Sequence, residues 1–289
     1  IYHYIWIKLF KDMPQFNPRD ITWLGFNARV LQEAMDETVP LHLRIRFLGI
    51  FSNNLDEFFR VRVAGLKRAL ELKEKLAVET FFDKPQRILD KINKIVIKQQ
   101  EDFEKTWDKI QEEVAEQKVY IKTPKKLTEK QKEFVKKYFD EEVESNVIPI
   151  LLHDHVQLPY LREKSLYLGI AMRRKDWKFE TKFAIIEVPA KANGRFVILP
   201  TENPEETDIM LLEDVIAFNL PHIFSYFGYD DFKANSFKVT KDAEFDLDND
   251  IRTSFVEKIE KGIKSRRKGK PTRFVFDKDM DKSLVEFLI

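Results

Sequence analysis

The amino-acid sequence predicts a helical bundle followed by an α+β domain. Through the first 117 residues, apolar side chains recur at intervals of three and four, as they do on amphipathic helices. After residue 146 the pattern changes to short β-rich runs with helical segments between them. The chain has 289 residues, enough to bury two cores of ordinary size. We expect the boundary at residues 117–124, where the apolar period lapses and Pro124 interrupts the chain.

Three helices account for the apolar periodicity of the first domain. Their predicted ranges are 21–35, 40–79 and 85–116. Asp20 is the expected N-cap of the first helix, and prolines suit the first turns of the other two, at Pro40 and Pro85. The third helix carries an amphipathic stripe made of Ile88, Ile92, Ile95, Gln99, Phe103, Trp107 and Ile110.

The second domain mixes helices and strands. A charged helix is expected first, over about residues 128–146. The predicted strands are 165–172, 181–188, 195–199 and 273–276, and the predicted helices between them are 208–218 and 250–261. This alternation makes the second domain α+β.

Composition excludes several classes of protein. The chain has 50 Lys and Arg against 49 Asp and Glu, a net charge of +1, which argues against a nucleic-acid-binding protein. It contains no cysteine, so disulfides, thiolate zinc sites and thiol nucleophiles are excluded, and a reducing cytoplasm suits it. No apolar run approaches the ~20 residues of a membrane helix.

Asn54 is the candidate binding residue because it interrupts an apolar helical face. The other members of this face are Phe47, Phe51, Phe58 and Val61. An amide offers an acceptor and a donor, the complement of an adenine edge, and the neighbouring phenylalanines could hold a flat base. The alternative is structural: Asn54 would cap a neighbouring helix or bond a backbone carbonyl inside the bundle.

Three other groups of residues have weaker claims. His153 and His155 could share a metal if they lay on a strand, but no third ligand is identifiable. The basic run 261–270 could contact a polyanion, yet it has no interleaved aromatic residues. The alternating acidic residues of 242–250 lack the glycine and terminal glutamate of an EF-hand. We therefore expect no metal ligands in this chain.

Four segments together resemble one protein family. The runs RDITWLGFNARVL (residues 19–31) and RFLGIFSNNLDEFFRVR (46–62) resemble the amino-terminal domain of polyphosphate kinases of the histidine-phosphorylating family. The runs TKDAEFDL (240–247) and RFVFDKDM (273–280) resemble segments of that family's head domain. The resemblance divides the chain into an extension outside the family at 1–15, an amino-terminal domain at 16–117 and a head domain at 118–289.

The resemblance implies a function and a site. Such an enzyme reversibly moves the terminal phosphate of ATP onto inorganic polyphosphate through a phosphohistidine, with Mg2+ neutralising charge. The family's adenine contact corresponds to Asn54, on the adenine side of the ATP site. The phosphorylated histidine and the metal ligands belong to two later domains, so we expect no catalytic residue in this chain and no activity from it alone.

The resemblance also implies partners and a location. We expect ATP or ADP and polyphosphate as ligands, a dimer or higher homo-oligomer formed through the head domain, no nucleic acid and a cytoplasmic location. The apolar end of the chain, 285–289, predicts that the polypeptide continues. The runner-up interpretation is a noncatalytic interaction or regulatory module that keeps the helical bundle.

Overall fold

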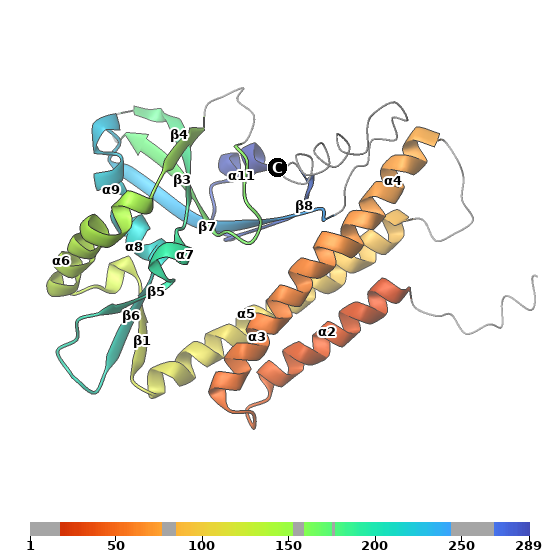
Figure 1. Ribbon diagram of the computed structural model, residues 1–289, viewed down its shortest axis with the longest axis horizontal. Helices are drawn as coiled ribbons and strands as arrows, with labels where there is room; N and C mark the ends of the chain where they lie inside the picture. Colours follow the sequence, from red (N-terminus) through yellow and green to blue (C-terminus); the bar gives the residue numbers. More distant parts are fainter. Residues whose placement is uncertain (1–17, 77–84, 153–158, 175–176, 244–268) are drawn as a thin grey trace, which may run out of the picture. The chain divides into compact units, whose positions relative to one another are not determined.

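The computed structural model describes residues 18–76, 85–152, 159–174, 177–243 and 269–289 (Figure 1). They form two compact units. The first comprises the described parts of residues 1–58 and 65–108, and the second those of 59–64 and 109–289. The first unit is helical, and the second contains all the described strands, so the predicted helical bundle followed by an α+β domain is confirmed.

The first unit is built from three long helical rods. Helix α2 spans Arg19–Met35, helices α3 and α4 span Leu41–Phe58 and Ala64–Leu76, and α5 spans Pro85–Glu116. The three predicted helices are therefore present. The predicted N-cap at Asp20 is wrong, because the helix begins at Arg19, two residues before the predicted start, and the Pro18 carbonyl accepts the backbone N–H groups of Ile21 and Thr22.

Each rod buries a line of side chains with helical spacing, and two of these lines contain amides. The buried residues are Leu24, Asn27, Leu31 and Ala34 on α2, Arg44, Leu48, Phe51, Leu55 and Phe58 on α3, and Leu89, Ile92, Val96, Gln99 and Thr106 on α5. Gln99 Nε2 donates to the Leu24 carbonyl (3.1 Å), and the rings of Phe51 and Phe103 stack at 5.8 Å. These contacts fasten α5 to α2 and α3.

A π-helical turn, η1 (Phe59–Val63), joins α3 to α4. A π turn takes up one more residue than an α turn, so it rotates the apolar stripe. Phe58, Phe59 and Val63 are buried, whereas Val61 is 36% exposed. The prediction that Val61 continues the face of Asn54 is therefore wrong. Residues 77–79 of the predicted helix lie outside the described residues.

The second unit contains two sheets. The larger is antiparallel, with strand order β2-β4-β3-β7-β8, and the smaller has the order β1-β6-β5, with β1 and β6 parallel. The strand bounds are β1 Val119–Lys122, β2 Pro149–Leu152, β3 Tyr167–Arg174, β4 Trp177–Glu187, β5 Phe196–Leu199, β6 Thr207–Leu211, β7 Asp231–Lys241 and β8 Pro271–Phe276. The four predicted strands correspond to β3, β4, β5 and β8.

Three helices are predicted in this unit, and two of them fall within the described residues. The one at 208–218 is partly wrong, since its first residues form β6 and only Leu212–Phe218 are helical, as α8. The predicted helix at 250–261 lies outside the described residues. The charged helix at 128–146 is present as α6 (Glu129–Tyr138), a π turn η3 (Phe139–Val143) and a 3-10 turn η4 (Glu144–Asn146). Thr128 begins it with a capping box to Gln131.

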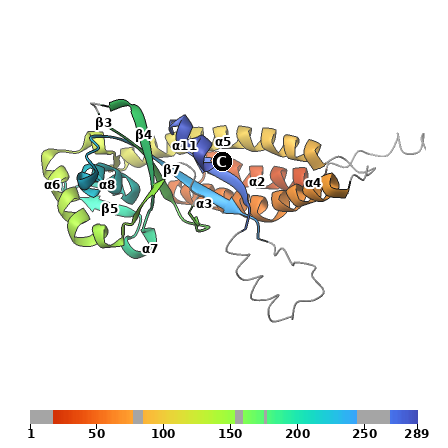
Figure 2. The ribbon, with the colours of Figure 1, turned by 90° about the horizontal axis from the view of Figure 1, so that it is seen from above.

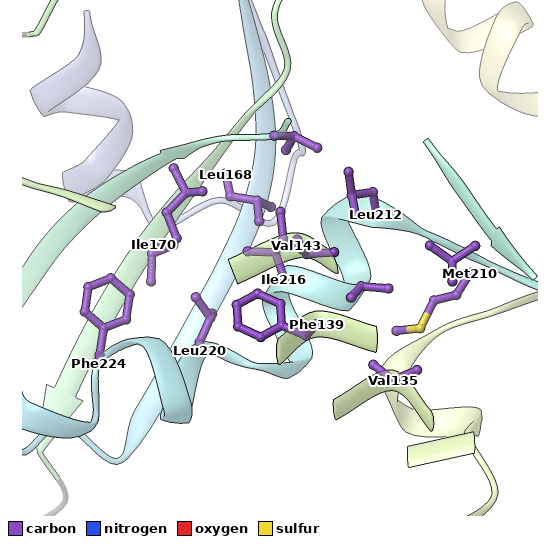
Figure 3. Close-up of a cluster of buried hydrophobic side chains, with 14 of the residues drawn as sticks. Val135, Phe139, Val143, Leu168, Ile170, Met210, Leu212, Ile216, Leu220 and Phe224 are labelled. Carbon is purple, nitrogen blue, oxygen red and sulfur yellow. The ribbon is translucent and has the colours of Figure 1, made fainter. Parts of the chain in front are cut away.

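Cores lie on both faces of the larger sheet. On one face, Leu168, Ile170 and Met172 of β3 pack with residues of α6, η3, α8 and α9 (Leu220–Ile223), as Figure 3 shows for Phe139, Ile216 and Leu220. On the other face, α11 (Lys282–Leu288) packs on Tyr167, Phe237 and Val239. Figure 2 shows α6 and α8 on one side of the sheet and α11 on the other.

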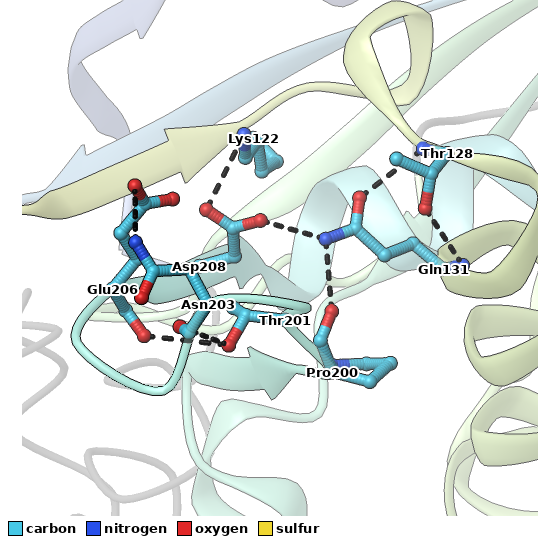
Figure 4. Close-up of polar contacts among 8 residues, drawn as sticks. All are labelled: Lys122, Thr128, Gln131, Pro200, Thr201, Asn203, Glu206 and Asp208. Carbon is cyan, nitrogen blue, oxygen red and sulfur yellow. Dashed lines mark hydrogen bonds and ion pairs between the residues drawn. The ribbon is translucent and has the colours of Figure 1, made fainter.

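A buried polar network ties the smaller sheet to α6 (Figure 4). Gln131 Nε2 donates both to Asp208 Oδ2 (2.7 Å) and to the Pro200 carbonyl (3.1 Å). Lys122 Nζ lies 3.3 Å from Asp208 Oδ1. The Asp208 carboxylate on β6 is thus paired with the Lys122 ammonium on β1 and the Gln131 amide on α6, as a buried charge requires.

Among the described helices, none is both long enough and apolar enough to cross a membrane.

Candidate functional site

Asn54 lies near the end of α3, in the first unit, and is half-buried. Its Nδ2 donates a hydrogen bond of 3.1 Å to Oδ1 of Asn27 on α2. Asn27 is fully buried, and its own Nδ2 donates to the Phe51 carbonyl (3.2 Å). The two amides and the carbonyl form a chain of hydrogen bonds from the helix backbone toward the surface.

Asn27 is the residue that the sequence analysis missed. It stands three residues after Leu24 and four before Leu31, so the spacing places it on the buried face of the first helix. A second asparagine on a buried face, like Asn54, is a signal for a paired amide, because buried amides need partners. The structural interpretation of Asn54 was a cap or a bond to a carbonyl, and the observed partner is instead another side chain.

The phenylalanines beside Asn54 do not present their faces for a base. Phe51 and Phe58 are each only 2% exposed. Phe51 stacks on Phe103, and Phe58 stacks on Trp23 with ring centroids 4.7 Å apart. The expectation that these two residues hold a flat base is therefore wrong: they belong to the core. One turn before Asn54 on α3 lies Ile50, an apolar residue whose side chain is exposed.

Two cationic side chains of the second unit, Arg60 and Lys241, have close partners. Arg60 Nε lies 3.7 Å from Glu163 Oε1, and the Lys241 ammonium lies 4.1 Å from the ring centre of Tyr160. Burial lowers the pKa of Lys241, while the charge of Glu163 opposes that shift. Glu163 Oε1 also accepts the backbone N–H of Lys241 (3.2 Å), so one carboxylate serves both cationic residues.

One group of three side chains could in principle coordinate a cation, although no metal site was predicted. Asp140, Glu144 and His222 are exposed, and their ligand atoms lie within 4.8 Å of one another. His222 Nε2 is 3.1 Å from Glu144 Oε1, and exposed acidic groups of this kind are common without a metal. His153, His155, most of the basic run and all but two residues of the acidic run lie outside the described residues.

The comparisons with known proteins cover both units. Residues 16–122 match the family model of the polyphosphate kinase N-terminal domain, and residues 130–289 match that of the polyphosphate kinase middle domain. A polyphosphate kinase of Vibrio parahaemolyticus is 36% identical over 273 residues, which are 93% of this chain and 38% of that protein. A polyphosphate kinase of Escherichia coli is 35% identical over 273 residues, 93% of this chain and 39% of that protein.

A solved structure agrees with the sequence matches. The crystal structure of a polyphosphate kinase from Porphyromonas gingivalis superposes with a TM-score of 0.77 at 30% identity, covering 96% of this chain and 37% of that one. These matches place the chain among kinases. It belongs to the polyphosphate kinase family, and it spans about two fifths of the length of the relatives that it matches.

Proposed function

We propose that this chain supplies the adenine-binding side and part of the subunit contacts of a polyphosphate kinase. The complete enzyme would reversibly transfer the terminal phosphate of ATP to inorganic polyphosphate through a phosphohistidine. Its ligands would be ATP or ADP and polyphosphate, and it would work in the cytoplasm. The observation that carries the proposal is the arrangement of Asn54, the residue that corresponds to the family's adenine contact.

The amide of Asn54 fits an adenine edge. One of its two N–H groups is used by Asn27, which leaves the second N–H and the oxygen Oδ1 of a half-buried side chain. This is the acceptor and donor pair that an amide offers to the amino group and a ring nitrogen of adenine. The triphosphate would be held elsewhere, since no phosphate-cradling glycine loop is present in the sequence.

Magnesium belongs to the part of the enzyme that this chain does not supply. The group formed by Asp140, Glu144 and His222 is exposed and includes an imidazole, whereas Mg2+ takes oxygen ligands, so it does not fit a catalytic Mg2+ site. When bound, Mg2+ would neutralise the charge of the phosphates. The residues of this chain would act on the base and on the partner subunit.

Kinetics of the full gene product test the adenine contact. Asn54→Ala should raise KM for ATP about five- to a hundredfold, because it removes one or two hydrogen bonds to a neutral base. The kcat should fall less, since the phosphates keep their contacts. Asn53→Ala is the matched control: Asn53 is the exposed neighbour on the same helix, and its loss should leave KM unchanged. An unchanged KM in Asn54→Ala would refute the adenine contact.

The proposal that the catalytic residues lie outside this chain can be tested separately. The chain alone should form no polyphosphate from ATP and Mg2+, because a covalent mechanism needs its nucleophile and the family's nucleophile segment is not in this sequence. Incubation with ATP labelled in the γ-phosphate measures both product and protein-bound phosphate. Polyphosphate synthesis, or a stable phosphohistidine on this chain, would show that the proposed division is wrong.

The second unit offers a surface for the proposed subunit contact. Phe196 and Ile198 on the edge strand β5 are 63% and 70% exposed. Ile198 pairs in register with Ile209 of β6, which pairs with Ile121 of β1, so an apolar row crosses the sheet. Apolar side chains gathered on one sheet face are typical of a surface that another protein covers. We propose that a second copy of the chain covers it.

A further inference from the structure

The orientation of the Asn54 amide is set by a backbone carbonyl. The Phe51 carbonyl lies in helix α3 and can only accept hydrogen bonds. The Asn27 atom that faces it, 3.2 Å away, must therefore be the donor Nδ2. Asn27 is fully buried, so water does not compete for this bond. The side chain of Asn27 is consequently held with its oxygen pointing away from Phe51.

The same constraint passes to Asn54. The oxygen Oδ1 of Asn27 needs a donor, and the Nδ2 of Asn54 supplies one at 3.1 Å. If the Asn54 amide turned over, two oxygens would face each other in a buried place, at a cost of about 1–3 kcal/mol or more. The hydrogen bond therefore fixes which end of the Asn54 amide points inward.

Because Nδ2 of Asn54 points inward, the positions of its remaining hydrogen-bond acceptor and donor are fixed as well. A primary amide has one N–H beside its oxygen and one directed away from it. If the N–H directed away from the oxygen is the one that bonds Asn27, the oxygen and the N–H beside it remain as an ordered acceptor and donor pair. Among the described residues, Asn27 is the one side chain that hydrogen-bonds the half-buried Asn54 side chain.

We propose that Asn27 is a positioning residue that makes the site select 6-aminopurines over 6-oxopurines; this rests on the proposed adenine contact of Asn54. Adenine presents an amino donor beside a ring-nitrogen acceptor, which matches the ordered pair. On the Watson–Crick edge, hypoxanthine and guanine present a carbonyl acceptor beside a protonated ring nitrogen, which opposes it. An amide that could turn over would accept both kinds of base, and Asn27 prevents that turn.

ATP and ITP are the nucleotides that test the proposal, because their bases differ in the 6-amino and 6-oxo groups and the proton on the adjacent ring nitrogen. The ratio of kcat/KM for ATP to that for ITP is measured in the full gene product, together with the Kd of each nucleotide by calorimetry. The unsubstituted protein should prefer ATP about 10- to 100-fold. Asn27→Leu should reduce the preference to about threefold or less, mainly through ITP, because the amide of Asn54 is then able to turn.

Two further variants serve as controls. Asn27→Asp keeps an oxygen that accepts from Asn54, and because burial favours the protonated carboxyl, its O–H can donate to the Phe51 carbonyl, so it should retain most of the preference. Gln99→Leu removes another buried amide of the same unit, one whose Nε2 bonds the Leu24 carbonyl. It should lower the melting temperature without changing the ratio, which separates loss of stability from loss of base selection.

The outcomes distinguish this inference from the proposed function. If Asn54→Ala abolishes the preference for ATP while a folded Asn27→Leu keeps it in full, the positioning role is refuted and the adenine contact stands. If Asn54→Ala keeps the preference, the adenine contact itself is refuted.

Should neither Asn27 variant fold, the unsubstituted protein still gives an answer. ITP should bind more weakly than purine riboside triphosphate, which has no 6-substituent, because the fixed Asn54 oxygen opposes the 6-oxo group. Binding of ITP as tight as that of ATP would mean that the amide is not held in one orientation, and would overturn the proposal.

Discussion

Gly169 of β3 and Leu284 of α11 approach so closely that a side chain at position 169 would displace the end of the Leu284 side chain. A Cβ added to Gly169 would stand 2.9 Å from Leu284 Cδ2 and 3.4 Å from Met280 Cε. Gly169 is the one glycine of β3, and it lies between Leu168 and Ile170, which pack on the opposite face. Helix α11 therefore packs on β3 at the position where the strand has no side chain.

Gly169→Ala should destabilise the protein. The methyl group would push Leu284 from its place or move α11, and overpacking of this kind costs about 1–3 kcal/mol. Gly49→Ala is a suitable control, because Gly49 lies in α3 with nothing within 4 Å of its added Cβ. Alanine there should stabilise the helix by about 0.5–1 kcal/mol. Thermal melts measure both, and a Gly169→Ala protein as stable as the unsubstituted one would contradict the close packing.

Asp214 should make stability depend on pH. Burial raises the pKa of this carboxyl to about 6, with further upward shifts from the charges of Glu213 and Asp277. The folded state therefore holds the proton more tightly than the unfolded state, whose value is near 3.8. The contribution of protonated Asp214 to the free energy of unfolding is fully present below about pH 4 and is lost as the pH rises through about 6.

Asp214→Asn tests that dependence. The variant has no charge to bury, so the difference in melting temperature between variant and unsubstituted protein should move in favour of the variant as the pH rises from 4 to 8. Groups that titrate elsewhere cancel in the difference. A difference that is the same at every pH would mean that the carboxyl titrates alike in both states.

The long helices could be predicted from the sequence because their signals are local. Helix α5 is described from Pro85 and ends at Glu116, as the long apolar stripe indicated. Strand β6 could not be predicted in this way. Its residues continue into α8 with helical spacing, and what makes them a strand is pairing with β1, whose Val119 lies opposite Thr207. Such pairing between distant segments leaves no signal within the strand itself.

The candidate site shows the same limit. Periodicity identified Asn54 as an amide on an apolar face, and it placed Phe51 and Phe58 on that face correctly. It could not show that those rings are covered by Phe103 and Trp23, or that Asn27 is the partner of the amide. The π turn at η1 also escaped prediction, because one extra residue in a helical turn changes the stripe without changing the composition.

The apolar row on the smaller sheet should govern the oligomeric state. Replacing Ile198 with lysine would place a charge in the middle of the proposed contact between copies, where burying it without a partner is costly. Ile198→Lys should therefore shift the protein toward the monomer in sedimentation experiments. Tyr226→Lys is the control, since Tyr226 is 98% exposed on a short turn and lies outside the row. A dimer that survives Ile198→Lys unchanged would rule out this face as the contact.

Asn54→Ala should lower the stability of the first unit as well as its affinity for ATP. The substitution leaves Oδ1 of Asn27 without its donor in a fully buried place, which costs about 1–3 kcal/mol. Asn27→Leu alone removes the buried amide but leaves Asn54 half-buried, where water can replace the lost partner. The double variant Asn27→Leu/Asn54→Ala has neither amide, so it should be more stable than the sum of the single effects predicts, by about 0.5–3 kcal/mol. Thermal and denaturant melts of the four proteins give this coupling energy directly. Strictly additive effects would show that the two amides do not depend on each other, and that the hydrogen bond between them does not stabilise the bundle.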